Sequence, residues 1–324
     1  MLRKLKVFYG SSNPQLAEEI CGHLGILSGE LTLTKFSNGN IKIKVEENVR
    51  NDDIFVIQTA SHPTNDHLVE MLIIIDALKY SSAGRITAVM PNFFYSRSDK
   101  KDEPRISITA RLIADLLQTA GANRILTMTL HSPQLMGFPR IPIDQLLATP
   151  ILVNHYRRKD LTNAVIAAPD VGSAKASRVF ARALNLPMVI LDKERLGDQE
   201  KVVMRNIIGD PAGMDVLLID DEILSGGSIL AAADILKQKG AAHIFVGCTH
   251  GFFSNDALAK IEKSVVEEVV ATNTIPITGP ERYGKLRVLS VAKMFADAIW
   301  AIHKGESVGA LFENLNHQSK GAEE

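Results

Sequence analysis

An aliphatic run at residues 216–219 most constrains the fold, because four successive apolar side chains leave no polar face for water. Such a run is typical of a parallel strand that helices cover on both sides. Two acids, a small-residue loop and an amphipathic helical pattern over residues 229–237 come next. The acids are Asp220 and Asp221, and the loop is Ser225, Gly226, Gly227 and Ser228. The order strand, loop, helix predicts an α/β fold.

The loop after this run has the composition of a phosphate site. Glycine reaches positive φ and lets the backbone approach an anion, while the start of a helix presents unpaired N–H groups and the positive end of its dipole. Asp220 and Asp221, at the end of the predicted strand, would project over the same crevice and could accept hydrogen bonds from vicinal sugar hydroxyls. Phosphate and diol together describe ribose 5-phosphate. The alternative is an ordinary strand-to-helix turn without a ligand, in which the aspartates cap the helix and the glycines allow the turn.

Strand-like runs alternate with helical patterns along the whole chain, as expected of βαβ units in mainly parallel sheets. The runs are residues 5–9, 53–58, 85–91, 124–130, 164–168, 187–191, 216–219 and 243–248. A chain of 324 residues, 46% of them hydrophobic, is long enough for two α/β domains.

An internal similarity indicates that these two domains are related by duplication. Asp53-Ile54-Phe55-Val56-Ile57, with the helix and strand that follow, resembles Asp215-Val216-Leu217-Leu218-Ile219 and its own helix and strand. We therefore expect an N-terminal domain at residues 1–147 and a C-terminal domain at residues 148–324, with the final helix packing back on the first. Only the second half has the acid pair and paired glycines, so only that half is expected to bind the ribose phosphate.

Charge and composition narrow the possible partners. The formal net charge is −1 without a long basic block, so we expect no nucleic-acid partner and no membrane surface. No apolar run approaches the roughly 20 residues of a membrane span, and the N-terminal residues lack a signal-peptide core, which favours a cytoplasmic protein. Cys21 and Cys248 have no metal-type spacing and are expected to be reduced core residues.

Two charged clusters follow predicted strands, where the sites of α/β proteins assemble. Residues 95–105 contain Arg97, which could bind polyphosphate; a solvated charged loop is the alternative. In residues 191–198, Lys193 and Arg195 could stabilise charge on a transferring phosphoryl group, although alone this cluster could equally be a surface turn.

Two further strand ends carry candidate cation ligands. His131 follows the run at 124–130, and Asp170 follows the run at 164–168. Mg²⁺ bound to a nucleotide needs few protein ligands, so one His and one Asp beside a triphosphate suit it. A hydrogen-bonded structural role is the alternative for the histidine.

With these residues, the chain resembles the ribose-phosphate pyrophosphokinase (phosphoribosyl-pyrophosphate synthetase) family over nearly its whole length. The resemblance is carried by Phe36-Ser37-Asn38-Gly39, Lys101-Asp102-Glu103-Pro104-Arg105, Leu130-His131, Pro169-Asp170-Val171-Gly172 and Thr272-Asn273-Thr274-Ile275-Pro276. It implies two phosphoribosyltransferase-like domains, Mg²⁺ as cofactor, and a homo-oligomer that is dimer-based and hexameric. It also implies transfer of the β,γ-diphosphoryl group of ATP to the 1-hydroxyl of ribose 5-phosphate, with AMP leaving.

The resemblance also implies roles for individual residues. Asp220 and Asp221 would hold the ribose hydroxyls, and Ser225, Gly226, Gly227 and Ser228 the 5-phosphate. Lys193 and Arg195 match the catalytic basic pair, and His131 and Asp170 the magnesium site. The ATP contacts would come from Arg97, Ser98 and His131, and, from a neighbouring subunit, Phe36, Asn38 and Asn40.

Several positions depart from the usual family pattern, so two other hypotheses about the function stay open. Asn40 stands where the family usually has Glu, Ser98 where it has Gln, Thr129 where it has Asp, Glu194 where it has Arg, and Leu224 at a usually polar position. One reading is a non-catalytic homologue that binds nucleotide and regulates an active synthetase. The other is an active enzyme with an altered donor or acceptor.

Overall fold

The structure is a computed structural model that describes residues 3–195 and 202–309, with the backbone alone described for residues 192–195 and 202–206. These residues form two compact units. Among the described residues, unit 1 takes those up to 147, then 274–276 and 290–309, and unit 2 takes 148–273 and 277–289. The chain thus leaves unit 1 and returns to it twice.

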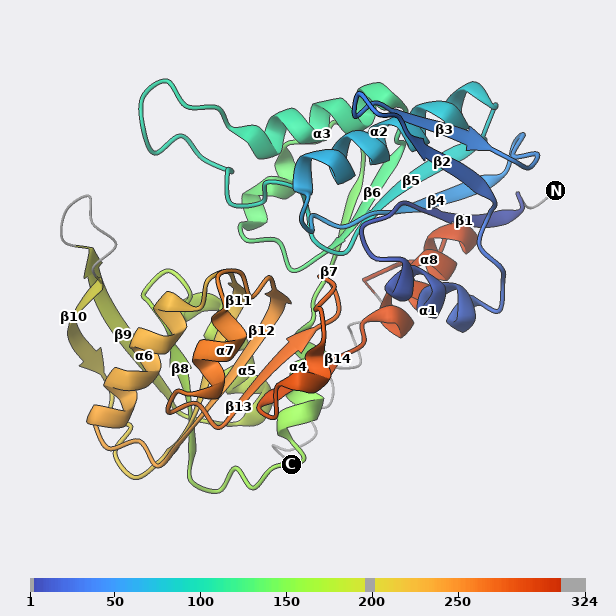
Figure 1. The fold of residues 1–324 in the computed structure, drawn as a ribbon. Coiled ribbons are helices and arrows are strands. Elements are labelled where there is room, and N and C mark those ends of the chain that lie inside the picture. Colours follow the sequence, from blue (N-terminus) through green and yellow to red (C-terminus); the bar gives the residue numbers. More distant parts are fainter. Residues whose placement is uncertain (1–2, 196–201, 310–324) are drawn as a thin grey trace. The chain divides into compact units, whose positions relative to one another are not determined.

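Unit 1 is a parallel sheet with helices on both faces and an antiparallel hairpin inserted after its first helix (Figure 1). Its strands are β1 (Leu5–Tyr9), β2 (Leu31–Lys35), β3 (Ile41–Val45), β4 (Asp53–Ile57), β5 (Arg85–Met90), β6 (Arg124–Met128) and β7 (Ile143–Leu146). Its helices are α1 (Pro14–Leu24), α2 (Thr64–Tyr80), α3 (Thr109–Ala120) and α8 (Ala292–Lys304), with a 3₁₀ turn at Pro133–Gly137. The sheet order is β1-β4-β5-β6-β7, and β2 pairs only with β3.

The core of unit 1 follows from strands that have no polar face. All five residues of β4 are buried. Ile54 and Val56 lie in one apolar cluster with Met71 and Ile74 of α2, and Figure 1 shows α2 and α3 on one face of the sheet, with α1 and α8 on the other. A sheet covered on both sides needs strands of this kind.

Polar contacts fasten α8 to unit 1. Asp53, at the start of β4, is 1% exposed and accepts hydrogen bonds from the Arg85 guanidinium, while its Oδ2 lies 2.8 Å from Nδ1 of His303. Arg85 Nη2 also donates to the carbonyl oxygen of Ile302 at 2.9 Å. The helix α8 is therefore an integral part of unit 1.

Unit 2 has a larger sheet of the same kind, in the order β10-β9-β8-β11-β12-β13-β14. Its strands are β8 (Ala164–Ala168), β9 (Met188–Arg195), β10 (Val202–Ile208), β11 (Asp215–Ile223), β12 (His243–Gly251), β13 (Glu268–Thr272) and β14 (Leu286–Leu289). Its helices are α4 (Thr149–Tyr156), α5 (Ala174–Leu184), α6 (Gly227–Gln238) and α7 (Ala257–Glu262), with a 3₁₀ turn at Pro280–Arg282. The β10–β9 pairing is antiparallel and the others are parallel.

The strand β11 is buried on both faces, as its sequence predicts. Val216 and Leu218 belong to the apolar cluster that includes residues of α6. Leu217 and Ile219 belong to a second cluster with Tyr156 of α4. Alternate side chains point to opposite faces of a strand, so the buried stretch at residues 216–219 is apolar at every position.

The two units share one topology. The parallel strands β1-β4-β5-β6-β7 of unit 1 match β8-β11-β12-β13-β14 of unit 2 in chain order and in sheet order. Each unit also has an antiparallel hairpin inserted between its first and second parallel strands: β2–β3 in unit 1 and β9–β10 in unit 2. The predicted α/β fold with mainly parallel sheets is confirmed, and the matching order is what a duplication produces.

Several strand limits differ from those the sequence predicts. The strand predicted at 216–219 runs from Asp215 to Ile223, because Glu222 and Ile223 continue the pairing with β12. The strand predicted at 187–191 continues to Arg195 because β10 pairs with it. The strands β2, β3, β7, β10, β13 and β14 are absent from the predicted runs.

Two other expectations can be compared with the described residues. Both cysteines are free and buried, with Cys21 4% and Cys248 0% exposed, which confirms them as reduced core residues. Within residues 3–195 and 202–309, no helix combines the length and the hydrophobicity needed to cross a bilayer.

Candidate functional site

The predicted phosphate loop joins β11 to α6 in unit 2. Gly226, the residue before the first turn of α6, has φ 75° and ψ −4°, a left-handed conformation that favours glycine. No described side chain caps this helix start, and its first turn contains no acid. The N–H groups of the first turn are thus available to an anion, and the helix dipole favours one there.

Gly226 and Gly227 differ in what a side chain would meet. A Cβ on Gly226 would lie 3.4 Å from Ala257 Cβ, at a φ that L residues rarely adopt. A Cβ on Gly227 would have only the Ser225 hydroxyl near it, at 3.9 Å, and Gly227 is not at positive φ. Local structure therefore requires a glycine at 226 and not at 227.

The acid pair lies within β11 and not beyond its end. The Asp221 N–H donates to Oδ1 of Asp220 at 2.9 Å, and both side chains are half-buried. Burial raises the pKa of the Asp220 carboxyl well above its ordinary value, and the charges of Asp221 and Asp170 raise it further. The strand thus holds two carboxyl groups that repel each other when both are ionised, just ahead of the predicted phosphate loop.

Asp170 is brought to the same edge of the sheet by the loop after β8. The strands β8 and β11 are parallel neighbours, so their carboxyl ends share an edge. Asp170 is held by its own loop: its Oδ1 accepts from the Ser173 N–H at 2.8 Å, and Ser173 Oγ donates to the Asp170 carbonyl at 2.8 Å. Its effect on the pKa of Asp220 indicates that the two carboxyls are close.

The basic pair predicted for catalysis lies in the inserted hairpin. Lys193 and Arg195 are residues of β9, where they pair with Met204 and Val202 of β10. The alternative that these residues form a surface turn is therefore wrong, because their backbone is in a β-strand. The side chains of Lys193 and Arg195 lie outside the described part of the chain, and so do residues 196–201.

Two of the predicted ATP residues lie at the carboxyl edge of the unit 1 sheet. Arg97 follows β5 and His131 follows β6, and these strands are parallel neighbours. Both side chains are exposed. Ser98 is in the same turn as Arg97, and its N–H donates to the Tyr95 carbonyl at 2.9 Å. His131 belongs to unit 1, whereas Asp170, its predicted partner for a cation, belongs to unit 2.

The remaining predicted ATP residues occupy the tip of the β2–β3 hairpin. Phe36 is 48% exposed, and its N–H donates to the Asn40 carbonyl at 2.8 Å. The side chain of Asn38 accepts from the Asn40 N–H at 3.0 Å, and Gly39 between them has φ 85°. The structure thus places Phe36, Asn38 and Asn40 together at this tip, and their contact with a nucleotide stays a prediction.

Sequence reasoning missed a set of buried polar residues at the carboxyl edge of unit 1. They include Ser12 (5% exposed), Gln58 (0%), His67 (7%) and Glu70 (3%). The available signal was a carboxylate, Glu70, on the inward side of α2 among Met71 and other core residues. A buried acid in such a position must be paired within the protein.

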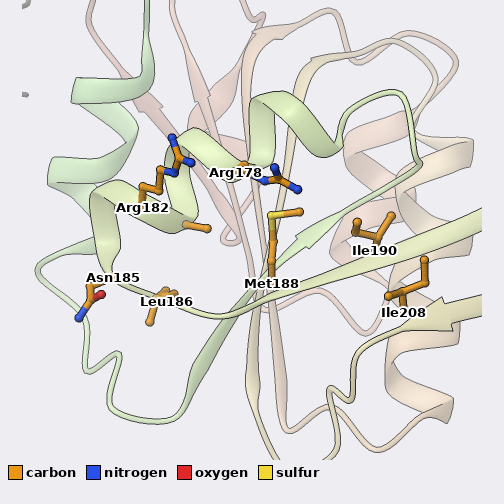
Figure 2. A pocket seen from close by; sticks show the side chains of 8 residues that line it. Arg178, Arg182, Asn185, Leu186, Met188, Ile190 and Ile208 are labelled. Carbon is orange, nitrogen blue, oxygen red and sulfur yellow. The ribbon is translucent and has the colours of Figure 1, made fainter.

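A separate hollow of about 420 Å³ opens between α5 and the base of the β9–β10 hairpin (Figure 2). Its lining is Arg178, Ala181, Arg182, Asn185, Leu186, Met188, Ile190 and Ile208. Figure 2 shows apolar side chains of the two strands beside the arginines of the helix. No residue predicted for ribose, ATP or metal lines this hollow, so it is distinct from the acid edge.

Comparison with known proteins gives consistent matches along the chain. The family model for the N-terminal domain of ribose phosphate pyrophosphokinase matches residues 5–121, and the model for the phosphoribosyl synthetase-associated domain matches residues 196–313. A ribose-phosphate pyrophosphokinase of Wolinella succinogenes is 46% identical over 311 residues, which is 96% of this chain and 100% of that protein. The corresponding protein of Deinococcus radiodurans is 46% identical over 313 residues, 95% of this chain and 98% of that protein.

A solved structure extends the similarity to the fold. The crystal structure of phosphoribosylpyrophosphate synthetase from Mycobacterium smegmatis has a TM-score of 0.89 and 36% sequence identity, covering 94% of this chain and 100% of that chain. With sequence matches of this extent, the chain belongs to the ribose-phosphate pyrophosphokinase family.

Proposed function

We propose that the chain is a ribose-phosphate diphosphokinase, which converts ATP and ribose 5-phosphate to 5-phosphoribosyl 1-diphosphate and AMP. The observation that carries the proposal is the carboxyl edge of unit 2. There the Asp220–Asp221 pair lies three residues ahead of a loop in which Gly226 has φ 75° and α6 begins without a capping side chain. Relatives of nearly the same length bear the corresponding name.

Each part of this edge suits a different part of ribose 5-phosphate. The phosphate would bind the N–H groups and hydroxyls of the loop, namely Ser225, Gly226, Gly227 and Ser228. The carboxylates of Asp220 and Asp221 would accept hydrogen bonds from the ribose hydroxyls. This orientation would leave the 1-hydroxyl free to react.

In the reaction, the oxygen of the 1-hydroxyl attacks the β-phosphorus of ATP. A bond forms between that oxygen and the β-phosphorus, the bond from the β-phosphorus to the α,β-bridging oxygen breaks, and the hydroxyl proton is released. AMP leaves with the bridging oxygen. Positioning and charge stabilisation provide most of the catalysis in such transfers, which is the role we assign to Lys193 and Arg195.

Mg²⁺ is the expected cofactor. The two side chains proposed as its ligands follow strands of the two sheets and match its preferred ligand types in part. Asp170 offers a carboxylate oxygen, the donor type that Mg²⁺ prefers, and His131 would be the second protein ligand. Within residues 3–195 and 202–309, no group of three or more His, Cys, Asp or Glu side chains forms a metal site, so water and phosphate oxygens would complete the coordination. When bound, the ion would neutralise charge on the transferred group.

We assign the ATP side to unit 1 and to a neighbouring subunit. Arg97, Ser98 and His131 would contact the nucleotide from the carboxyl edge of unit 1. The hairpin tip with Phe36, Asn38 and Asn40 would reach the adenine of an adjacent protomer, which requires a homo-oligomer; we propose dimers assembled into a hexamer.

The test is AMP release by the purified protein with Mg²⁺ and ATP, with and without ribose 5-phosphate. We expect AMP formation that depends on ribose 5-phosphate. Ligand binding without AMP formation would support the regulatory homologue instead. Turnover restricted to another triphosphate or sugar phosphate would support an enzyme with an altered donor or acceptor, for which Asn40 and Leu224, the latter 37% exposed, are the relevant residues.

A further inference from the structure

The loop after β4 in unit 1 occupies the place that the ribose loop has in unit 2, but the protein fills it with its own side chains. Five residues after the start of β4 stands Gln58, where β11 has Asp220. Gln58 is fully buried, and its Nε2 donates to Oε1 of Glu70 at 3.0 Å and to the His67 carbonyl at 3.1 Å. The ligand-facing position of one unit is thus an internal contact in the other.

The Glu70 carboxylate is bound as an external anion would be. Oε1 accepts from the backbone N–H of Ser11, and Oε2 accepts from the Ser11 hydroxyl at 2.8 Å. Ser11 lies just ahead of α1, whose positive dipole end favours an acid nearby. Glu70 is only 3% exposed, and the groups of Ser11 and Gln58 that donate to it are neutral.

The same contacts connect the loop after β1 to the loop after β4. The Ser12 N–H donates to Oε1 of Gln58 at 3.1 Å, and the Thr59 N–H donates to Oγ of Ser12 at 2.8 Å. The Ser61 hydroxyl donates to the Ser12 carbonyl at 3.2 Å. A Cβ on Gly10 would lie 2.2 Å from Oε1 of Glu70, so the backbone approaches this carboxylate as closely as glycine permits.

From Thr59 the network reaches the segment that carries Arg97. The Thr59 hydroxyl accepts from the Asn92 N–H at 3.0 Å and donates to the Thr274 carbonyl at 2.8 Å. The Asn92 carbonyl accepts from the Ala60 N–H at 3.3 Å. Asn92 directly follows Pro91 at the end of β5, five residues before Arg97.

We propose that Glu70 is a positioning residue for nucleotide binding: as a built-in anion it fixes the loops after β1 and β4 and, through Thr59 and Asn92, the segment that presents Arg97. The proposal rests on the proposed function, because Arg97 is assigned there to ATP. It predicts a selective defect, in which ATP is affected and ribose 5-phosphate is not.

The experiment compares Glu70→Gln with Leu78→Ala. Glutamine removes the negative charge and places a donor where Oε2 accepts from the Ser11 hydroxyl, while its remaining oxygen can still accept from the Ser11 N–H and from Gln58. Leu78, fully buried on the same helix, tests plain loss of stability away from this edge. For each protein we would measure kcat, both KM values, and the Kd of a non-hydrolysable ATP analogue, well below the melting temperature. We expect Glu70→Gln to raise the KM and Kd for nucleotide about tenfold or more and to change the KM for ribose 5-phosphate less than twofold. We expect Leu78→Ala to lower the melting temperature and leave both KM values within twofold.

Equal effects on both substrates, no effect, or the same nucleotide defect in Leu78→Ala would overturn the proposal. If Glu70→Gln does not fold, Thr59→Val, which removes the hydroxyl between Asn92 and Thr274, must give the same selective loss. Failure of the proposed function can be told apart from failure of this proposal. In that case the wild-type protein would release no AMP, but the ratio of the analogue Kd values of Glu70→Gln and wild type would still test the role of Glu70. A wild-type protein that binds no nucleotide would overturn both.

Discussion

The loops after β4 and β11 occupy equivalent places in two units of the same topology and have opposite properties. After β11, three residues lead to α6, whose first turn has no acid and no capping side chain. After β4, six residues lead to α2, whose first turn contains Asp66 and whose loop is filled by Gln58, Ser61 and Glu70. One loop is open to an external anion, and the other is closed by the protein's own groups.

The difference shows how a duplicated fold can keep its architecture and change its chemistry. Both loops depend on the same strand-to-helix geometry, in which backbone N–H groups converge at a parallel sheet edge. In unit 1 the protein's own groups take these positions: the Thr59 N–H in the loop after β4 donates to the Ser12 hydroxyl, and the Ser11 N–H in the loop after β1 donates to the Glu70 carboxylate. In unit 2 no described side chain caps the start of α6, which is what the proposed binding of a phosphate requires.

Among variants that test the difference in chemistry between the two units, the largest effect is expected in the inserted hairpins. Lys193→Ala, in the hairpin of unit 2, should lower kcat about 1,000-fold and change the affinity for ribose 5-phosphate little, because its charge is needed mainly in the transition state. Lys44→Ala, in the hairpin of unit 1, is the matched control and should leave kcat unchanged. Steady-state AMP release measures both. An unchanged kcat for Lys193→Ala would remove this residue from the mechanism.

The acid pair should have the next largest effect. Asp220→Asn with Asp221→Asn should weaken ribose 5-phosphate binding about 100-fold, because hydrogen bonds to charged groups contribute about 1.5–3 kcal/mol each. Asp215→Asn, at the start of the same strand, removes an exposed pair with His243 and is the control. Calorimetric titration gives both affinities, and equal affinity in the double variant would exclude the diol contact.

Adding one methyl group at Gly227 should weaken ligand binding without changing the stability of the fold. Gly227→Ala has room for its Cβ in the protein but places it where phosphate would approach, so we expect about tenfold weaker ribose 5-phosphate binding and an unchanged melting temperature. Gly22→Ala, in α1 of unit 1, should stabilise by about 1 kcal/mol without affecting binding. Unaltered binding in Gly227→Ala would place the phosphate elsewhere.

The smallest expected effect concerns pH. Because the folded-state pKa of Asp220 is raised, the protonated form is favoured by folding, and its contribution to stability is lost as pH rises through that pKa. At neutral pH, Asp220→Asn should therefore stabilise the protein by about 1 kcal/mol, or roughly 2–4 °C. Melting curves should show this gain shrinking as the pH falls below the raised pKa. Wild-type affinity for ribose 5-phosphate should fall over the same interval, since a protonated carboxyl is a poorer acceptor.

Sequence patterns predicted the buried strands of both units, because a strand covered on two faces has no polar residue to obscure it. They predicted the strand-to-helix loop at residues 225–228, where Gly226 has a conformation that few other residues adopt; its binding of ribose 5-phosphate stays a prediction. They missed short strands such as β7 and β14, whose burial is partial and whose pairing depends on distant segments. Glu70 was missed because its partners, Ser11 and Gln58, are brought to it only by the folded sheet.

The return of the chain to unit 1 has a consequence for the order in which the protein can mature on the ribosome. One face of the unit 1 sheet is completed by α8, through the contacts of His303 and Ile302 with Asp53 and Arg85. Because α8 is translated after the described residues of unit 2, the N-terminal sheet is synthesised first but is finished only after them. Fragments that stop before α8 would leave part of this apolar face uncovered, so unit 1 cannot be completed before unit 2 has been synthesised.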